Sequence, residues 1–163
     1  MLSRRHIRIK VMQSLYSFLS TKDSQLPLAE KAMLKHFNEV VELKLVVLSL
    51  LIEIVKYANN FYEDGKKKHL PNSSDLDPNT KFVNNKIVCL IRENDSLMTR
   101  ISKVSGIWLN NDHDIARKLF NVIIRSSLYA KYLESDNTST DYDKRFIVDL
   151  MNDYVLNNEL VHH

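Results

Sequence analysis

Hydrophobic residues recur at helical spacing over most of the chain, and the longest stripe lies in its first half. Successive members are mostly three or four positions apart: Leu34, Phe37, Val41, Leu45, Leu48, Ile52, Val55 and Tyr62. Such spacing places side chains on one face of an α-helix. Pro27 suits the first turn of a helix, and Gly65 favours an end. The pattern therefore predicts one long helix over about residues 27–64.

Shorter helices are predicted on both sides of this one. The first begins near Ser3, a candidate N-cap, and ends near Ser20, before the polar stretch STKDSQ. Residues 65–79 are rich in turn-forming Pro, Ser, Asn and Asp and predict a loop. Beyond it, helical patterns cover residues 77–92, 95–104, 113–134 with a kink near Ser126, and 142–157, and Gly106–Asp112 form a break. We expect an all-α, multi-helix bundle in a single helical domain over residues 1–163.

Composition narrows the class of protein further. A chain with only 2 Gly and 3 Pro in 163 residues lacks the turn formers that an all-β fold needs. Cys89 is the only cysteine, so no disulfide can form within the chain. A lone cysteine fits a reducing cytoplasm, and we expect Cys89 to be a small buried apolar residue. The most apolar run, Leu45–Val55, is too short to span a membrane and contains Glu53.

The net charge of +3 does not by itself indicate nucleic acid, but the first predicted helix concentrates its cations. At about 100° per residue, Arg4 and Arg8 fall on the middle of an apolar arc. Burying unpaired guanidinium groups there would be costly, so we expect the first two turns to extend past the core and burial to begin near Val11. The arc itself consists of Val11, Met12, Leu15, Phe18 and Leu19.

Cations at a helix N-terminus interact unfavourably with the helix dipole, which costs about 0.3–1 kcal/mol for each cation. An anionic partner would reverse this effect, because exposed N–H groups and guanidinium groups both suit phosphate. Arg4, Arg5 and Arg8 are therefore candidate phosphate contacts. The alternative is that these arginines are simply solvated, or paired with acidic residues of another helix.

Other candidate sites are weaker. Lys66, Lys67 and Lys68 form a basic loop with His69, for which simple solvation is favoured over a second phosphate contact. The histidines show no metal-ligand spacing, and no nucleophile–base pair stands out. We therefore expect no catalytic residue, metal or cofactor. Trp108 and Tyr129 are interpreted as packing residues rather than base-stacking platforms.

Two further patterns concern the second half of the chain. Residues from Asp112 to Ile124 match residues from Asp143 to Val155 at a constant offset of 31, with both aspartates as expected N-caps. This pattern is typical of a duplicated helical unit, and coincidence among generic helix patterns accounts for it as well. The chain ends in LVHH without a helix stop signal, so we expect the natural protein to continue past His163.

The N-terminal residues resemble a known family. Arg4-Arg5-His6-Ile7-Arg8, followed by Gln13-Ser14-Leu15-Tyr16, resembles the first helix of the transcription antitermination factor NusB family. Three longer segments are similar to the N-terminal region of extended NusB-like proteins of the Bacteroidetes group: RIKVMQSLYSF, DLDPNTKFVNNKIVCLIREN and Tyr142–His163.

The resemblance implies an all-helical RNA-binding factor in transcription antitermination or termination. It would bind a short boxA-like single-stranded RNA together with the ribosomal protein NusE, in a transcription elongation complex. Arg4, Arg5 and Arg8 match the family's RNA-contacting positions, and Lys10 adds a cation beside them. His6 departs from the family's arginine. Tyr16 matches a tyrosine linked to RNA binding, although its place on the helix fits core burial equally well.

The family's C-terminal helical bundle has no recognisable match in this chain, and this leaves three functional hypotheses. The first is an RNA-binding transcription factor, or its N-terminal part. The second is a helical protein–protein interaction module that uses the long helix as a docking surface. The third is an accessory RNA-binding domain of an RNA methyltransferase, in which the catalytic residues would lie outside this chain.

Overall fold

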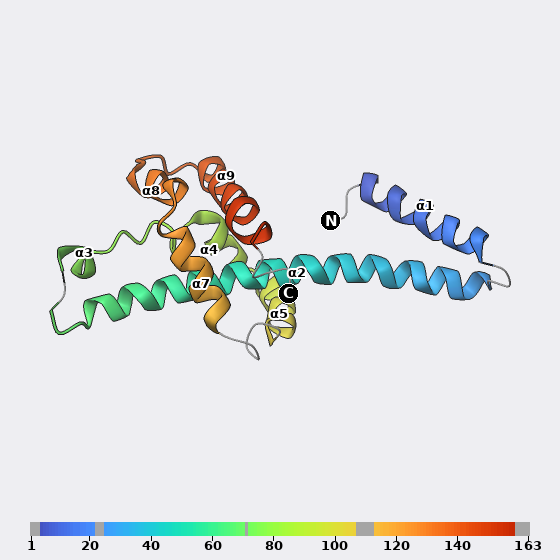
Figure 1. Ribbon diagram of the computed structural model, residues 1–163, viewed down its shortest axis with the longest axis horizontal. Coiled ribbons are helices and arrows are strands. Elements are labelled where there is room, and N and C mark those ends of the chain that lie inside the picture. Colours follow the sequence, from blue (N-terminus) through green and yellow to red (C-terminus); the bar gives the residue numbers. More distant parts are fainter. Residues whose placement is uncertain (1–3, 22–24, 71, 107–112, 159–163) are drawn as a thin grey trace. The chain divides into compact units, whose positions relative to one another are not determined.

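The computed structural model describes residues 4–21, 25–70, 72–106 and 113–158, and these residues form helices and turns without any β-strand. The predicted all-α fold is therefore confirmed (Figure 1). Ser3, Trp108, Asp112 and the segment 159–163, on which several predictions rest, lie outside the described residues. In chain order the elements are α1 (Arg4–Ser20), α2 (Leu26–Lys66), α3 (Ser73–Leu76), α4 (Lys86–Arg92), α5 (Asp95–Val104), α7 (His113–Ile123), α8 (Ser127–Glu134), α9 (Thr140–Leu150) and the π-helical turn η1 (Met151–Leu156).

The chain groups into two compact units, Met1–Val47 and Leu48–His163, which we call the N-terminal and C-terminal units. The N-terminal unit contains α1 and the first part of α2. The C-terminal unit contains the rest of α2 and all later helices.

The long helix α2 confirms the main prediction from the hydrophobic stripe. It has 41 residues, which corresponds to a length of about 60 Å at 1.5 Å per residue. Pro27 lies in its first turn, as expected. Gly65 does not end it, because the helix continues to Lys66, which pairs with Glu63 one turn earlier at 2.9 Å.

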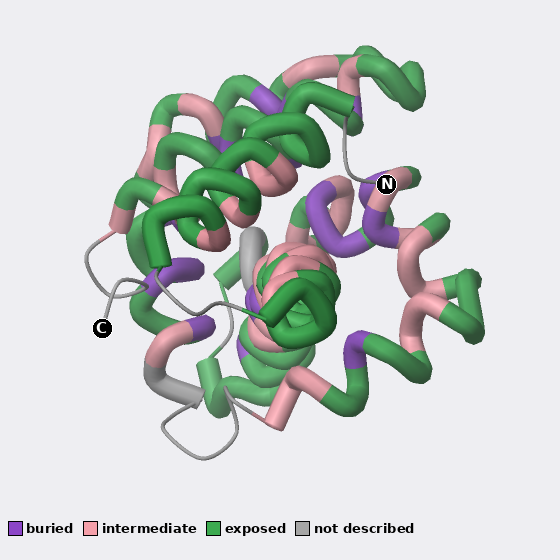
Figure 2. Tube along the Cα trace, turned by 90° about the vertical axis from the view of Figure 1, so that its right-hand side faces the viewer, coloured by how far each residue is buried: buried purple, intermediate pink, exposed green. Residues whose placement is uncertain are grey.

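The core belongs to the C-terminal unit, where the second part of α2 presents Leu50, Leu51, Ile54 and Val55 to the later helices. The trace in Figure 2 alternates between buried and exposed positions along its helices, as expected for amphipathic helices. The predicted buried role of the Leu45–Val55 run is thus confirmed. Aromatic rings fill much of the remaining interior: Phe82, Phe120, Tyr129, Tyr132 and Phe146.

Two predicted helices have different boundaries in the structure. The helix predicted over residues 77–92 is only α4, because the Asn85 side chain accepts hydrogen bonds from the backbone N–H groups of Ile87 and Val88 and starts the helix there. Before it, Phe82 and Val83 lie buried in a turn. The kink expected near Ser126 is confirmed as a break, with Ser126 as the N-cap of α8.

The prediction that Asp143 is an N-cap is wrong. Ser139 caps α9, and Asp143 lies inside the helix with its side chain buried. The matched pair of capping aspartates therefore does not support a duplicated unit. Cys89 is half-buried rather than fully buried, and the loop predicted over residues 65–79 contains the short helix α3.

Candidate nucleic-acid interface

The first candidate surface is α1, whose charged groups are all cationic. Arg4, Arg5 and Arg8 are exposed, and α1 contains no acidic residue. None of the three arginines has an ion-pair partner within the described part of the chain. Ion pairs of α2 include Lys35–Glu39, Lys56–Glu53 and Lys66–Glu63. The alternative in which these arginines pair with another helix of this chain is therefore not observed.

The expectation that the apolar arc of α1 enters the core is wrong. No residue of α1 is buried, and Met12, Leu15 and Leu19 are 71%, 52% and 80% exposed. The half-buried residues of α1 are Lys10, Val11, Ser14 and Phe18. The last two line a cavity of about 240 Å³ together with residues of α2. Because α1 has only α2 as a neighbour within its unit, a single narrow stripe is covered and the rest of the arc stays in solvent.

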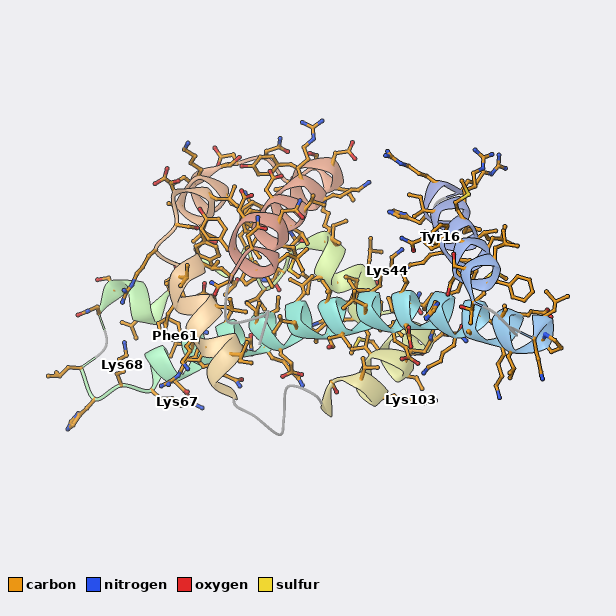
Figure 3. The ribbon with its side chains drawn as sticks, turned by 45° about the vertical axis from the view of Figure 1, so that its right-hand side comes forward. Tyr16, Lys44, Phe61, Lys67, Lys68 and Lys103 are labelled. Carbon is orange, nitrogen blue, oxygen red and sulfur yellow. The ribbon has the colours of Figure 1, made fainter. Side chains whose placement is uncertain are left out.

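Tyr16 lies on the outer face of α1 and is 75% exposed (Figure 3). Core burial, the alternative reading of this tyrosine, does not occur. At about 100° per residue, Tyr16 shares a sector of about 80° with Arg5, Arg8 and Met12. The outer face of α1 therefore combines guanidinium groups, an aromatic ring and apolar side chains.

Lys10 occupies a different position from the arginines. It is half-buried in a small groove that Gln13, Ser17 and His36 also line. Its ammonium group therefore belongs to the side of α1 that faces α2, and it is the least accessible of the predicted cationic contacts.

The second predicted surface, Lys66–Lys68, belongs to the C-terminal unit and is exposed (Figure 3). Lys66 ends α2 and pairs with Glu63 at 2.9 Å. The backbone N–H groups of Lys67 and Lys68 donate to the carbonyls of Asp64 and Gly65, so the chain forms a tight turn at the end of α2. The arginines and the lysines thus form two separate candidate surfaces, one in each unit.

Sequence reasoning missed a buried polar cluster in the C-terminal unit. The Tyr132 hydroxyl donates to Asp143 Oδ1 at 2.8 Å, and the backbone N–H of Lys86 donates to Asp143 Oδ2 at 3.0 Å. Asn85 Nδ2 donates to the Tyr132 hydroxyl oxygen at 3.0 Å. Burial, with the adjacent Asp143 carboxylate, raises the pKa of Tyr132 above its usual value. These groups satisfy one another and hold α4, α8 and α9 together, which is a structural role.

Lys81 completes this cluster on the side of the α8 C-terminus. Its ammonium group donates to the carbonyl oxygens of Tyr132, at 2.9 Å, and Ser135. It also lies 4.6 Å from the centre of the Tyr132 ring, a cation–π distance. No local sequence motif predicts this role of Lys81, because its partners are about fifty residues away in sequence. The cation is occupied by helix capping and is not available to a ligand.

The described residues contain neither a metal site nor a membrane-spanning helix. No group of three or more His, Cys, Asp or Glu side chains is placed to hold a metal ion in this part of the chain. No helix that the structure describes combines the length and the apolar character needed to cross a membrane.

Comparison with known proteins gives no relative of this chain. No protein-family model, no curated protein and no solved structure matches it.

Proposed function

We propose that this chain is a cytoplasmic RNA-binding factor in transcription antitermination or termination, which holds single-stranded RNA on the outer face of α1. The observation that carries the proposal is the set of three exposed arginines on a helix without an acidic residue. Guanidinium groups bind phosphates with two parallel hydrogen bonds. The adjoining exposed Tyr16 offers a ring on which a base can stack. The ribosomal protein NusE is the proposed partner, on the strength of the N-terminal resemblance alone.

The test is an anisotropy titration of labelled single-stranded RNA with the full chain at two or more salt concentrations. For three to five phosphate contacts we expect a dissociation constant of about 10⁻⁴–10⁻⁶ M at physiological salt. We expect boxA-like and scrambled RNAs to bind about equally, because these contacts are to phosphates. Replacing Arg4, Arg5 and Arg8 with Gln should weaken binding and lower the salt slope by about 2, at roughly 0.7 per phosphate contact.

A matched control removes the same number of charges elsewhere. Arg100, Lys103 and Lys131 are exposed residues of the C-terminal unit, and the triple Gln variant has the same net charge as the arginine variant. It should bind RNA nearly as well as the unchanged chain. Equal loss in both variants would show that only net charge matters, and a lower melting temperature in the arginine variant would show that those residues are structural.

A specific observation favours one second candidate, a helical protein–protein interaction module. Ten large hydrophobic residues of the N-terminal unit are exposed, a density that is typical of a binding surface. They are Ile7, Ile9, Met12, Leu15, Tyr16, Leu19, Leu26, Leu28, Leu34 and Leu43. Under this alternative the titration above would detect no RNA binding. Leu19→Ser and Leu34→Ser would then weaken the binding of a protein partner.

A further inference from the structure

The C-terminal unit contains an open cavity of about 420 Å³ at the end of α2. This volume falls in the range of about 300–1,000 Å³ that is typical of small-molecule sites. None of the described residues that line it has a charged side chain. Its walls come from α2, the residues before α4, and the α7–α8 region: Phe61, Tyr62, Asn79, Ile124, Tyr129 and Leu133. Such a cavity suits a neutral, largely apolar group.

The Tyr62 hydroxyl is a hydrogen-bond donor directed by its partner Tyr129. The hydroxyl oxygens of Tyr62 and Tyr129 lie 2.5 Å apart, and neither hydroxyl has another hydrogen-bond partner among the described residues. Tyr129 is only 2% exposed, so its proton must be satisfied inside the protein and is best donated to Tyr62. The proton of the half-buried Tyr62 is then free to be donated to an acceptor in the cavity. Burial raises the pKa of both phenols, so both remain protonated donors at neutral pH.

The other polar side chain of the wall is already engaged. Asn79 Nδ2 donates to the carbonyl of Leu133 at 3.1 Å, and Asn79 Oδ1 accepts from the backbone N–H of Lys81 at 3.0 Å. Asn79 therefore closes the wall between two segments that are distant in sequence. Asn79 keeps its second Nδ2 N–H, and the Tyr62 hydroxyl is the other donor that the described lining offers to a ligand.

A partly exposed aromatic ring, that of Phe61, lies next to Tyr62 in the lining. Phe61 lines the cavity, is 42% exposed, and packs edge-on against Tyr62 and Phe120 at centroid distances of 5.9 and 5.6 Å. These two contacts fix the ring while leaving part of it accessible. A flat aromatic ligand could pack against it, and a partly exposed aromatic residue is the usual platform for an unstacked base.

Cations lie directly next to the cavity. Gly65 forms part of the lining, and the backbone N–H of Lys68 donates to the Gly65 carbonyl at 3.3 Å. Lys67 is two residues from Gly65 in sequence, so its exposed side chain is attached close to the cavity rim and is long enough to reach a phosphate outside it. Figure 3 shows Phe61, Lys67 and Lys68 at the same end of α2.

We propose that this cavity binds one base of a single-stranded RNA. The base packs against Phe61 and accepts a hydrogen bond from Tyr62, and an adjoining phosphate contacts Lys67. The inference rests on the proposed RNA-binding function and adds to it a contact with a base in the C-terminal unit, separate from any stacking on Tyr16 of α1. The apolar lining fits an uncharged base, and the cationic side chain beside the cavity fits the charged phosphate backbone.

The test compares two labelled decamers with the same phosphates, oligouridine and an abasic oligoribonucleotide, in titrations against the full chain. Base stacking on an aromatic ring contributes about 1–3 kcal/mol, so oligouridine should bind about 5- to 150-fold more tightly. Phe61→Leu should lower this ratio without changing the salt slope. Tyr62→Phe should lower the ratio by about tenfold or less, as expected for loss of one hydrogen bond.

Three variants separate this inference from the α1 proposal. Replacing Arg4, Arg5 and Arg8 with Gln should lower affinity and salt slope but leave the ratio unchanged. The Lys67→Gln variant should lower the salt slope by about 0.7, the value for one phosphate contact. The matched control for the aromatic variants is Tyr57→Phe, because Tyr57 lies on the same helix and packs on Phe120 but does not line the cavity. It should behave like the unchanged chain.

Two results would overturn the inference. One is an oligouridine-to-abasic ratio near one in the unchanged chain, or a ratio that Phe61→Leu leaves intact while helicity is unchanged. The other comes from irradiating the complex with RNA containing 4-thiouridine. Cross-links should map to peptides that contain the cavity residues, and cross-links only to α1 would place the base elsewhere. If RNA does not bind at all, titration with uridine 5′-monophosphate decides, because the inference still requires NMR shifts at Phe61 and Tyr62.

Discussion

The two units of this protein are built from helices with the same periodicity but bury their side chains very differently. In the described part of the N-terminal unit, Leu45 is the only buried hydrophobic residue, and it lies next to the boundary with the other unit. In the C-terminal unit several helices surround the second part of α2, and Leu50, Ile54 and Val55 are almost fully buried. A helix buries an apolar face only where neighbours cover it. Periodicity alone therefore identifies the helices without identifying the core.

The largest effect is expected from truncating a core side chain of the C-terminal unit, which tests this comparison directly. Phe120 is fully buried and contacts Tyr57, Phe61, Tyr62 and Tyr129, so Phe120→Ala should lower the free energy of unfolding by about 3–5 kcal/mol. Urea denaturation followed by circular dichroism measures this change. Phe18→Ala in α1, where the ring is half-buried, should cost well under half as much. Equal costs would show that the N-terminal unit has a core of its own.

A smaller effect is expected in the buried polar cluster. Asp143→Ala removes the acceptor of the Tyr132 hydroxyl and of the Lys86 N–H, and an unsatisfied buried group costs about 1–3 kcal/mol. Asp149→Ala is the control, because Asp149 lies on the same helix but is exposed. It should stay within about 0.5 kcal/mol of the unchanged chain in the same denaturation experiment. A harmless Asp143→Ala would show that the cluster does not hold α4, α8 and α9 together.

The smallest effect concerns pH. Burial raises the pKa of Tyr62 and Tyr129 in the folded protein, so the unfolded state loses its tyrosine protons first as pH rises. The resulting stability is fully present below the unfolded pKa of about 10 and decreases above it, by about 0.4 kcal/mol per buried tyrosine at pH 10. The urea midpoint at pH 10 should thus lie below that at pH 8. Tyr129→Phe should reduce this difference, whereas Tyr16→Phe, which alters an exposed tyrosine of the N-terminal unit, should leave it unchanged.

The sequence by itself determined the helical fold and much of the element order. The hydrophobic stripe located α2 to within two residues at either end, and α5 was predicted with its observed bounds, Asp95–Val104. The exposure of Arg4, Arg5 and Arg8 also followed from sequence, because an unpaired guanidinium group is too costly to bury. These features depend on local spacing and on the chemistry of single residues.

The tertiary structure decided what each helix face contacts. The outward position of Leu15 and Leu19 depends on how few helices surround α1, and the burial of Asp143 depends on Tyr132 and Lys86, which come from other elements. The cavity likewise joins Phe61 and Tyr62 of α2 to Tyr129 of α8, 67 positions beyond Tyr62 in sequence. Local periodicity carries no information about such distant partners, because they meet only when the helices pack. For this reason the sequence indicated RNA contacts on α1, whereas the proposed base contact in the cavity emerged only from the folded chain.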